Sequence, residues 1–230
     1  MGHPAGLEEE NPLLRVAAAD VRRDVATRLQ SLRYNPGHII MDRGGPPGDV
    51  YFIRSGEAQI TIYSLLGRQI TVHTIGAGEM VGDLAAFDGG ARSASVLAAT
   101  ELRLVRMSRA DFRLCIESSP AAALWLAERL ASGMRRLTER VYELTVLNVQ
   151  MRVQCELLRI ARAGREVQGI VSISPAPTHL ELANRVGTNR EAVTREIRAL
   201  CEARILRTGR RSIEFIDVAR LEQAVQRATA

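Results

Sequence analysis

Apolar and polar residues recur with different periods along the chain, and each period predicts a different kind of element. In the middle of the chain, apolar residues follow alternating steps of four and three, the spacing of a coiled-coil seam at about 3.5 residues per turn. The seam positions are Ala123, Ala127, Leu130, Met134, Leu137, Val141 and Leu144. Because no Pro follows Pro120 within this stretch, the pattern predicts one long helix over 120–148.

An apolar seam on a helix needs a surface that covers it. One interpretation is an amphipathic helix that packs on its own domain, and the off-seam residues Trp125, Ala131 and Tyr142 are predicted to face inward in this way. The other interpretation is a parallel pair of helices across a two-fold axis. Because the seam continues for about three heptads, the homodimer is favoured and 120–148 is predicted to be a dimerisation helix.

Before this helix, the apolar pattern mostly has a period of two. Residues 12–32 are predicted to form one or two helices, and 109–117 a helix that Ser108 caps. Between them, turn residues, for example at 66–68, separate short alternating stretches that are typical of strands. The predicted strands are 50–53, 58–63, 69–73, 95–97 and 101–106. Short strands at regular spacing predict an antiparallel β-roll or sandwich.

After the long helix, the pattern becomes helical again. A helix is predicted from 149 to about 162, followed by a short strand over 171–173. The second domain is therefore mainly helical. In chain order, the expected organisation is a flexible tail over 1–11, a β-roll domain over 12–119, the dimerisation helix over 120–148 and a C-terminal domain over 149–230.

The composition narrows the possible functions. The net charge is +5 and every basic residue is Arg, whose planar guanidinium suits the phosphates of a nucleic acid. The absence of Lys excludes a P-loop lysine, a Schiff base and a Ser–Lys dyad. No GxSxG or HExxH motif occurs, so no catalytic residue is assigned and the protein is not expected to be an enzyme.

Metal and membrane chemistry are not expected either. The three Cys are far apart and the four His are isolated, so no metal site is predicted. No apolar run approaches the roughly 20 residues of a membrane span, and the N-terminus lacks the apolar core of a signal peptide. We therefore expect a cytoplasmic protein without a membrane partner.

A Gly-rich stretch between two predicted strands contains the residue types of a phosphate site. Gly82 lets a ligand approach the backbone closely, and backbone N–H groups in such a turn form an anion nest. Arg92 could clamp a phosphate, with Ser93 as a hydroxyl donor, while Asp83 could accept from a sugar hydroxyl. The alternative is a Gly-rich turn with a solvated Arg.

Two segments of this stretch resemble the phosphate-binding cassette of cyclic-nucleotide-binding domains. They are Gly82-Asp83-Leu84-Ala85 and Ala91-Arg92-Ser93-Ala94-Ser95-Val96. The resemblance implies a cyclic nucleotide, cAMP or cGMP, as the effector, with its phosphate held by Arg92, Ser93 and the amide of Ala85. The nucleotide-binding residues expected in this cassette are Gly82, Asp83, Leu84, Ala85, Arg92 and Ser93.

Two positions depart from the family pattern. The family has Glu where this chain has Asp83, a shorter acid that can still reach a ribose hydroxyl if the backbone shifts. In the bacterial regulators of this family, a Thr-Ser pair on the long helix contacts the base, and this chain has Leu137-Thr138 there. The resemblance therefore implies that Thr138 contacts the base, and it leaves open whether the base is adenine or guanine.

Residues 178–195 have the spacing of a helix-turn-helix motif. Thr178 and Glu181 are predicted to form a capping box, and Gly187 to supply the left-handed residue that ends the first helix. Ala183 is small where two helices cross, and Val193 is the apolar plug of the second helix. Each of these positions has its own steric reason, which makes the motif specific.

The second helix, over 189–203, has an exposed N-terminal face. In this motif Arg can read guanine and Glu can accept from cytosine, although a solvated face or a second capping box from Thr188 to Glu191 is the alternative. Basic residues in the turn before the strand 212–215 indicate a wing that contacts phosphate. The residues expected to bind DNA are Thr188, Asn189, Arg190, Glu191, Thr194, Arg195, Arg210 and Arg211.

The tract 178–217 resembles the winged-helix domain of the Crp–Fnr regulators. The resemblance implies double-stranded DNA with a palindromic operator and TGTGA-like half-sites, and RNA polymerase as a further partner. The implied fold is α+β: an N-terminal antiparallel β-roll of the jelly-roll, cyclic-nucleotide-binding type, a long dimerisation helix and a C-terminal winged helix-turn-helix domain.

The expected function is a homodimeric transcription regulator that responds to a cyclic nucleotide. One alternative keeps DNA binding but replaces the effector by a gas or redox signal, or by none. Another is a cyclic-nucleotide-binding regulatory subunit of an enzyme, against which the helix-turn-helix motif argues.

Overall fold

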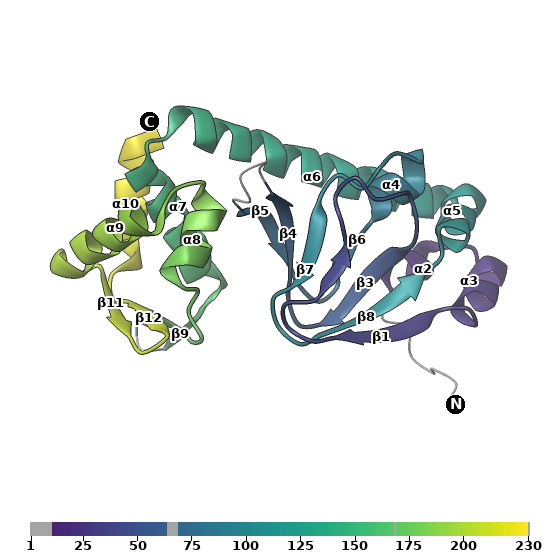
Figure 1. Cartoon of the computed structure of the whole chain (residues 1–230), viewed down its shortest axis with the longest axis horizontal. Helices are drawn as coiled ribbons and strands as arrows, with labels where there is room; N and C mark the ends of the chain where they lie inside the picture. The colour runs from purple at the N-terminus through teal and green to yellow at the C-terminus, as the bar shows by residue number, and fades with distance from the viewer. Residues whose placement is uncertain (1–10, 64–68, 168, 230) are drawn as a thin grey trace. The chain divides into compact units, whose positions relative to one another are not determined.

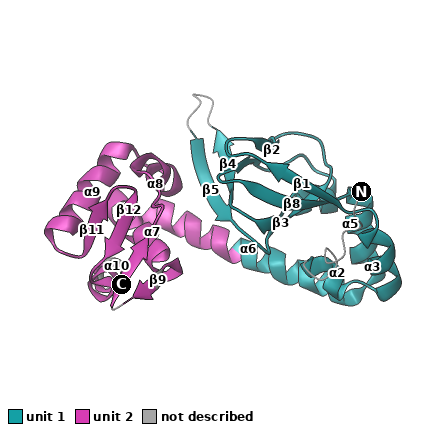
Figure 2. Cartoon of the chain, turned by 90° about the horizontal axis from the view of Figure 1, so that it is seen from below, with its two compact units in different colours: residues 1–134 teal, residues 135–230 magenta. Residues whose placement is uncertain are grey.

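The computed structural model describes residues 11–63, 69–167 and 169–229. Contacts divide the chain into two compact units, residues 1–134 and 135–230, which Figure 2 colours separately. The division falls within the long helix α6 (Pro120–Val146), so each unit contains part of this helix. The domain boundaries given above stay predictions.

Two four-stranded antiparallel sheets form the first unit (Figure 1). One has the strand order β1-β8-β3-β6 and the other has the order β2-β7-β4-β5. The strands are β1 (Gln30–Tyr34), β2 (Ile39–Met41), β3 (Val50–Ser55), β4 (Ala58–Tyr63), β5 (Gln69–Ile75), β6 (Met80–Val81), β7 (Ser95–Ala98) and β8 (Leu102–Met107). This arrangement confirms the predicted antiparallel roll, to which the structure adds the very short strands β2 and β6.

The helices of the first unit are α2 (Pro12–Val16), α3 (Ala19–Ala26), α4 (Asp83–Asp88), α5 (Arg109–Ser118) and the start of α6. Period-two alternation in β8 places Leu104 in one apolar cluster, with residues of both sheets, and its neighbour Val105 in another. The second cluster includes Leu14 of α2, Phe112 of α5 and Leu126 of α6. The roll is thus anchored to the helices through one face of the sheet that contains β8.

The N-terminal prediction is wrong in two places. The segment 12–32, predicted as one or two helices, forms the two helices α2 and α3 but ends at Ala26, because Leu32 pairs with Leu104 in the β1–β8 ladder and becomes part of a strand. Asn11, expected in the flexible tail, is buried as the N-cap of α2. The rest of that tail and the turn at 66–68 lie outside the described residues.

The long helix buries a narrower face than predicted. Trp125 packs against the cluster that contains the buried Ala122 and Leu126, which confirms its predicted inward position. Ala131 and Tyr142, which were predicted to face inward, are exposed. Ala131 lies five residues after Leu126, about 140° around the helix, so it points away from the buried face.

Most of the later seam positions present apolar side chains to solvent in the single chain. Met134, Leu137, Val141 and Leu144 are 71%, 55%, 60% and 42% exposed. An exposed apolar stripe at coiled-coil spacing is unusual on the surface of a single chain. The pattern is compatible with a helix pair, which stays a prediction.

The second unit continues from the end of α6 into a winged domain. Its elements are α7 (Val149–Ala163), β9 (Arg165–Val167), β10 (Ile170–Ile173), α8 (His179–Val186), α9 (Arg190–Glu202), β11 (Leu206–Gly209), β12 (Ser212–Phe215) and α10 (Val218–Thr229). The strands form one sheet in the order β11-β12-β10-β9. Leu157 of α7, Val186 of α8, Val193 of α9, Phe215 of β12 and Leu221 of α10 are all fully buried in its core.

Candidate functional site

The cassette begins with a backbone turn that requires Gly. Gly82 has φ +88°, and a Cβ at this position would lie 2.5 Å from Nη1 of Arg92 and 2.8 Å from the carbonyl oxygen of Asp49. Gly82 is the N-cap of α4 and provides no side-chain cap. The first-turn N–H groups of Asp83, Leu84 and Ala85 therefore have no acceptor within the helix or from its cap, and together they favour an anion.

Arg92 is held against this turn. Its side chain is 8% exposed, with Nη1 donating to the carbonyl of Gly82 and Nη2 to that of Asp49, both at 2.9 Å. Its backbone pairs with the loop before β3, since its N–H donates to Gly45 and its carbonyl accepts from Gly44. Two carbonyls and two backbone bonds thus fix the guanidinium beside the N-terminus of α4.

Ser93 follows Arg92 and is exposed, while the nearby Ser95 is buried. The Oγ of Ser95 accepts from the N–H of Arg43 at 2.9 Å, so this hydroxyl fixes the neighbouring loop. The first unit therefore brings Arg92 against the start of α4, which Gly82, Asp83, Leu84 and Ala85 form, and Ser93 is its neighbour in the chain. Thr138, in contrast, belongs to the second unit and has an exposed side chain on α6.

Arg129 of α6 is a residue of this site that the sequence reasoning missed. Its Nε lies 3.5 Å from Oδ2 of Asp83, and its Nη2 donates to the carbonyl of Met80 at 2.6 Å. Both charged side chains are mostly buried, at 22% and 15% exposure. Arg129 lies seven residues, about two turns, after the buried Ala122, so its place on the inward face of α6 is the signal that could have found it.

The helix-turn-helix has the predicted local structure. The Thr178 side chain accepts from the N–H of Glu181, and the Glu181 carboxylate accepts from the N–H of Thr178. Gly187 has φ +69° and ends α8, which confirms the left-handed turn. Ala183 and Val193 are buried, as their expected packing roles require.

The start of α9 exposes most of the predicted DNA-binding residues. Arg190, Glu191 and Arg195 are exposed. Asn189 is the N-cap of α9, with its Oδ1 accepting from Ala192 at 2.9 Å, so the alternative capping box from Thr188 to Glu191 is wrong. Thr188 lies in the preceding turn and donates its N–H to the carbonyl of Ala183 in α8, at 3.0 Å.

Thr194 is already engaged by protein groups. Its hydroxyl donates to the carbonyl of Arg190 at 2.9 Å and lies 2.8 Å from Nδ1 of His179. Burial and the charge of Arg190 lower the pKa of His179. A neutral His179 therefore sits between the two helices of the motif at neutral pH.

The wing is a tight hairpin. Gly209 of β11 pairs with Ser212 of β12, so Arg210 and Arg211 form its two-residue loop. Both side chains are exposed, and Arg211 has a positive φ of 60°. The carbonyl of Arg211 accepts from the N–H of Ala176 at 2.8 Å, which ties the wing tip to the loop before α8.

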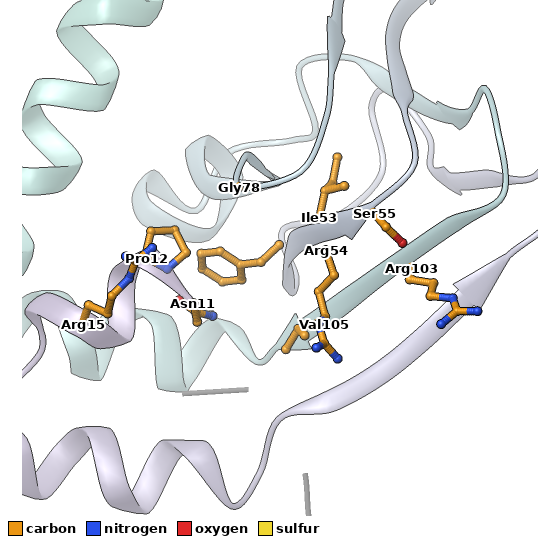
Figure 3. Close-up of a pocket in the computed structure, with 10 residues that line it drawn as sticks. Asn11, Pro12, Arg15, Ile53, Arg54, Ser55, Gly78, Arg103 and Val105 are labelled. Atoms are coloured by element: carbon orange, nitrogen blue, oxygen red, sulfur yellow. The ribbon is translucent and has the colours of Figure 1, made fainter. Parts of the chain in front are cut away.

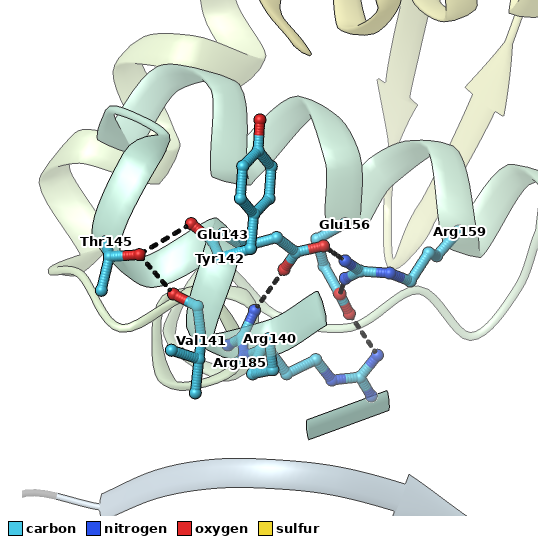
Figure 4. A network of polar contacts seen from close by, with 8 residues as sticks. All are labelled: Arg140, Val141, Tyr142, Glu143, Thr145, Glu156, Arg159 and Arg185. Atoms are coloured by element: carbon cyan, nitrogen blue, oxygen red, sulfur yellow. Dashed lines mark hydrogen bonds and ion pairs between the residues drawn. The ribbon is translucent and has the colours of Figure 1, made fainter. Parts of the chain in front are cut away.

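A chain of charges joins the end of α6 to α7 and α8 within the second unit (Figure 4). Glu143 of α6 is 5% exposed and pairs with Arg140 at 3.0 Å and with Arg159 of α7. Arg159 also pairs with Glu156 at 2.6 Å, and Glu156 contacts Arg185 of α8 at 3.3 Å. Although desolvation opposes the effect, Glu156 and Glu143 raise the pKa of Arg159, so its charge is retained.

The described residues hold neither a metal cluster nor a membrane-spanning helix. Among the described residues, no group of three or more His, Cys, Asp or Glu is placed to hold a metal ion. Within the same part of the chain, no helix is long and apolar enough to span a membrane.

Two family models match the chain. Residues 31–119 match the cyclic nucleotide-binding domain model, and residues 151–224 match the Crp-like helix-turn-helix domain model. The helix-turn-helix match favours a transcription regulator over the regulatory subunit of an enzyme. The first range includes the cassette, and the second includes helix α9 of the helix-turn-helix motif.

Relatives of the whole chain agree with this assignment. The chain is 30% identical over 195 residues to the CRP-like cAMP-activated global transcriptional regulator of Mycobacterium tuberculosis, covering 84% of this chain and 87% of the relative. It is 33% identical over 198 residues to the cyclic AMP receptor protein of Thermus thermophilus, covering 85% and 88%.

The fold is also found in solved structures. A crp/fnr-family regulator from Eubacterium rectale has a TM-score of 0.75 at 20% identity, covering 95% of this chain and all of that one. The c-di-GMP-responsive regulator CLP of Xanthomonas campestris has a TM-score of 0.72 at 22% identity, covering 86% and 99%. With its nucleotide-binding-type roll, its winged helix-turn-helix and these relatives, the chain belongs to the Crp–Fnr family of DNA-binding transcription regulators.

Proposed function

We propose that this regulator binds a cyclic nucleotide in the cassette and acts as a homodimer on a palindromic operator. The observation that carries the proposal is the buried Arg92, whose guanidinium is fixed at 2.9 Å from the carbonyl of Gly82, at the start of α4. A preorganised cation beside uncapped N–H groups suits a phosphate that has a single negative charge. Cyclic AMP is the first candidate, because the two relatives above are named for it.

Each part of the nucleotide has a proposed partner. Arg92, the Ser93 hydroxyl and the amides of Leu84 and Ala85 hold the cyclic phosphate. Asp83, the N-terminal residue of α4, accepts from the ribose hydroxyl. Thr138 contacts the base, as the family resemblance implies.

The Asp83–Arg129 ion pair gives the nucleotide a route to the long helix. A ribose hydroxyl that donates to Asp83 binds a carboxylate that Arg129 of α6 holds in place, with its Nε 3.5 Å from Oδ2 of Asp83. In the second unit, the Glu143 network connects the same helix to α7 and α8. We propose that the Asp83–Arg129 pair and the Glu143 network couple nucleotide binding to the DNA-binding helix α9. Such coupling between two sites is typically worth about 1–3 kcal/mol.

DNA recognition follows from the face at the start of α9. Arg190, Glu191, Thr194 and Arg195 are proposed to face base edges in the major groove. The wing residues Arg210 and Arg211 are proposed to contact phosphates. In a dimer the two reading helices would meet half-sites about 34 Å apart. RNA polymerase is the further partner that the family resemblance implies.

Calorimetric titration of the purified protein with cAMP and, in parallel, cGMP tests the nucleotide site. We expect one nucleotide to bind per chain and Arg92→Gln to abolish the heat signal while DNA binding without nucleotide stays measurable. Arg22→Gln removes the same charge from α3 in the first unit and is the matched control. An unchanged nucleotide affinity in Arg92→Gln, with Arg22→Gln also unchanged, would refute the site.

A further inference from the structure

The loop between β2 and β3, residues 42–49, contacts Arg92 at both its backbone and its side chain. Gly44 donates its N–H to the carbonyl of Arg92 at 2.9 Å, and the carbonyl of Gly45 accepts from the N–H of Arg92 at 3.0 Å. At the end of the loop, the carbonyl of Asp49 accepts from Nη2 of Arg92 at 2.9 Å. A guanidinium has more N–H donors than its carbonyl bonds use here, so Arg92 can still donate to an anion. The position of Asp49 therefore helps to fix the direction of these donors.

Asp49 is itself held by a residue of a distant strand. Nε of Arg106, on β8, donates to Oδ2 of Asp49, and Nη1 of Arg106 donates to Oε1 of Gln30 at 3.2 Å. The Asp49 and Arg106 side chains are 21% and 43% exposed, so the ion pair is partly shielded from solvent. Arg103 and Val105 line a cavity on one face of the sheet, and Arg106 points to the other face because residues alternate along a strand (Figure 3). Arg106 thus ties the end of the loop to β8.

Gly48, the neighbour of Asp49, leaves room for the guanidinium. A Cβ at Gly48 would lie 3.1 Å from Nη2 of Arg92, which is closer than an ordinary van der Waals contact. Gly48 does not have a positive φ, so Ala fits its backbone and changes only the space beside Arg92. Because Nη2 is also bonded to the carbonyl of Asp49, a methyl group at position 48 would displace a fixed atom.

We propose that Arg106 and Gly48 are positioning residues for Arg92, and that they set which of the two exocyclic oxygens of a cyclic phosphate Arg92 binds. Arg106 acts through Asp49, and Gly48 acts by leaving space. This inference rests on the proposed nucleotide site, in which Arg92 holds the cyclic phosphate. A guanidinium that is fixed from both sides approaches one oxygen, whereas a loosened or displaced guanidinium discriminates less between the two.

Titration calorimetry with cAMP, or with cGMP if it binds more tightly, and with the Rp and Sp phosphorothioates of that nucleotide tests this role. In each diastereomer, sulfur replaces one exocyclic oxygen and is a weaker hydrogen-bond acceptor. We expect the wild type to prefer one diastereomer by about fivefold or more, because the other lacks the oxygen that Arg92 binds. Arg106→Gln and Gly48→Ala should each reduce this preference at least about threefold. They should also lower the affinity for the unmodified nucleotide about threefold to fivefold, as expected for a partly exposed ion pair.

Three control variants separate positioning from general damage. Arg106→Lys keeps a positive charge beside Asp49 and should restore most of the preference. Gly76→Ala also lacks a positive φ, but its Cβ would lie 3.9 Å from the carbonyl oxygen of Gly56, so it should stay within about twofold of the wild type. Arg22→Gln removes a charge from α3 and should do the same. A variant that is only destabilised weakens both diastereomers equally and leaves their ratio unchanged.

The outcomes distinguish this role from the nucleotide site itself. The role is overturned if the wild type binds the nucleotide without preferring a diastereomer, or if Arg106→Gln and Gly48→Ala keep the wild-type preference. Either result leaves the nucleotide site intact. A wild type that binds neither cAMP nor cGMP refutes the site, and this role with it. Circular dichroism checks folding, and Gly48→Ala alone decides if Arg106→Gln does not fold.

Discussion

At the scale of single residues, the cassette depends on groups that are far apart in sequence but fixed by backbone contacts. Arg92 is held by carbonyls of Gly82 and Asp49, so its charge is in place before a ligand arrives. Asp83 is held by Arg129, a residue of the long helix. Because Arg129 holds the carboxylate of Asp83, we regard Arg129 as a positioning residue for the proposed ribose contact.

Replacing Arg129 tests that role. Arg129→Gln removes the ion pair with Asp83 and one donor to Met80, so we expect cAMP affinity to fall about tenfold, or 1.4 kcal/mol. Calorimetry gives the affinity, and thermal unfolding shows whether the first unit remains folded. Equal affinities in the wild type and in Arg129→Gln would contradict a positioning role.

His179 should make the second unit sensitive to acid. Its pKa in the folded protein is lowered from its ordinary value of 6.5, so the unfolded state binds more protons in this range and stability falls as the pH drops below 6.5. We expect His179→Gln to lose less stability than the wild type between about pH 7.5 and pH 5.5. Urea unfolding at the two values measures this difference, and identical losses would exclude the effect of His179.

Sequence reasoning located most single residues of the candidate site but not Arg129. Gly82, Asp83 and Arg92 lie close together along the chain, and a local motif reveals them. Arg129 reaches Asp83 only because α6 packs on the roll through Ala122 and Leu126. A contact of this kind depends on which face of a helix is buried. The seam pattern predicted that Ala131 and Tyr142 face inward, whereas the buried face contains Ala122 and Leu126.

At the scale of elements, local signals fixed the helix-turn-helix better than the roll. The capping box and the Gly187 turn depend on residues three to five positions apart, and both were predicted. Strand β2 has three residues, and its partner β7 lies more than 50 positions away, so no local period could reveal it. The helix predicted up to residue 32 failed for the same reason, since the β8 partner of β1 is distant.

The turn between α8 and α9 gives a prediction at this scale. Gly187→Ala introduces a Cβ at φ +69°, and this atom would lie 3.3 Å from Cδ2 of Leu144. We expect a loss of about 1–2 kcal/mol in the free energy of unfolding, measured with urea. Gly169→Ala has a similar φ of +78° but no atom within 4 Å of its Cβ, and it is the matched control for crowding. A loss no larger than that of the control would show that the Leu144 contact is unimportant.

At the scale of the whole molecule, the proposal requires two chains joined through α6. Met134, Leu137 and Val141 present an apolar stripe that the single chain leaves exposed. Burying such a stripe against its copy is the physical reason to expect a dimer. The stripe follows α6 across residue 134, where the two compact units meet in the sequence.

Leu137→Glu is expected to convert the dimer to a monomer at micromolar concentration, because it places like charges in the seam. Sedimentation equilibrium should change from twice the chain mass of 25.3 kDa to that mass. Tyr142→Glu adds the same charge at an exposed position about 140° from Leu137 and should stay dimeric. A dimer that is unaffected by Leu137→Glu would place the interface elsewhere.

The affinity for an operator duplex with and without nucleotide tests the central claim most directly. A labelled duplex with two TGTGA-like half-sites is titrated by fluorescence anisotropy, with the wild type and Arg92→Gln compared under the same salt. We predict that cAMP or cGMP changes the wild-type affinity by about 5- to 150-fold and leaves Arg92→Gln unchanged. A wild-type affinity that is the same without nucleotide, with cAMP and with cGMP would contradict the account.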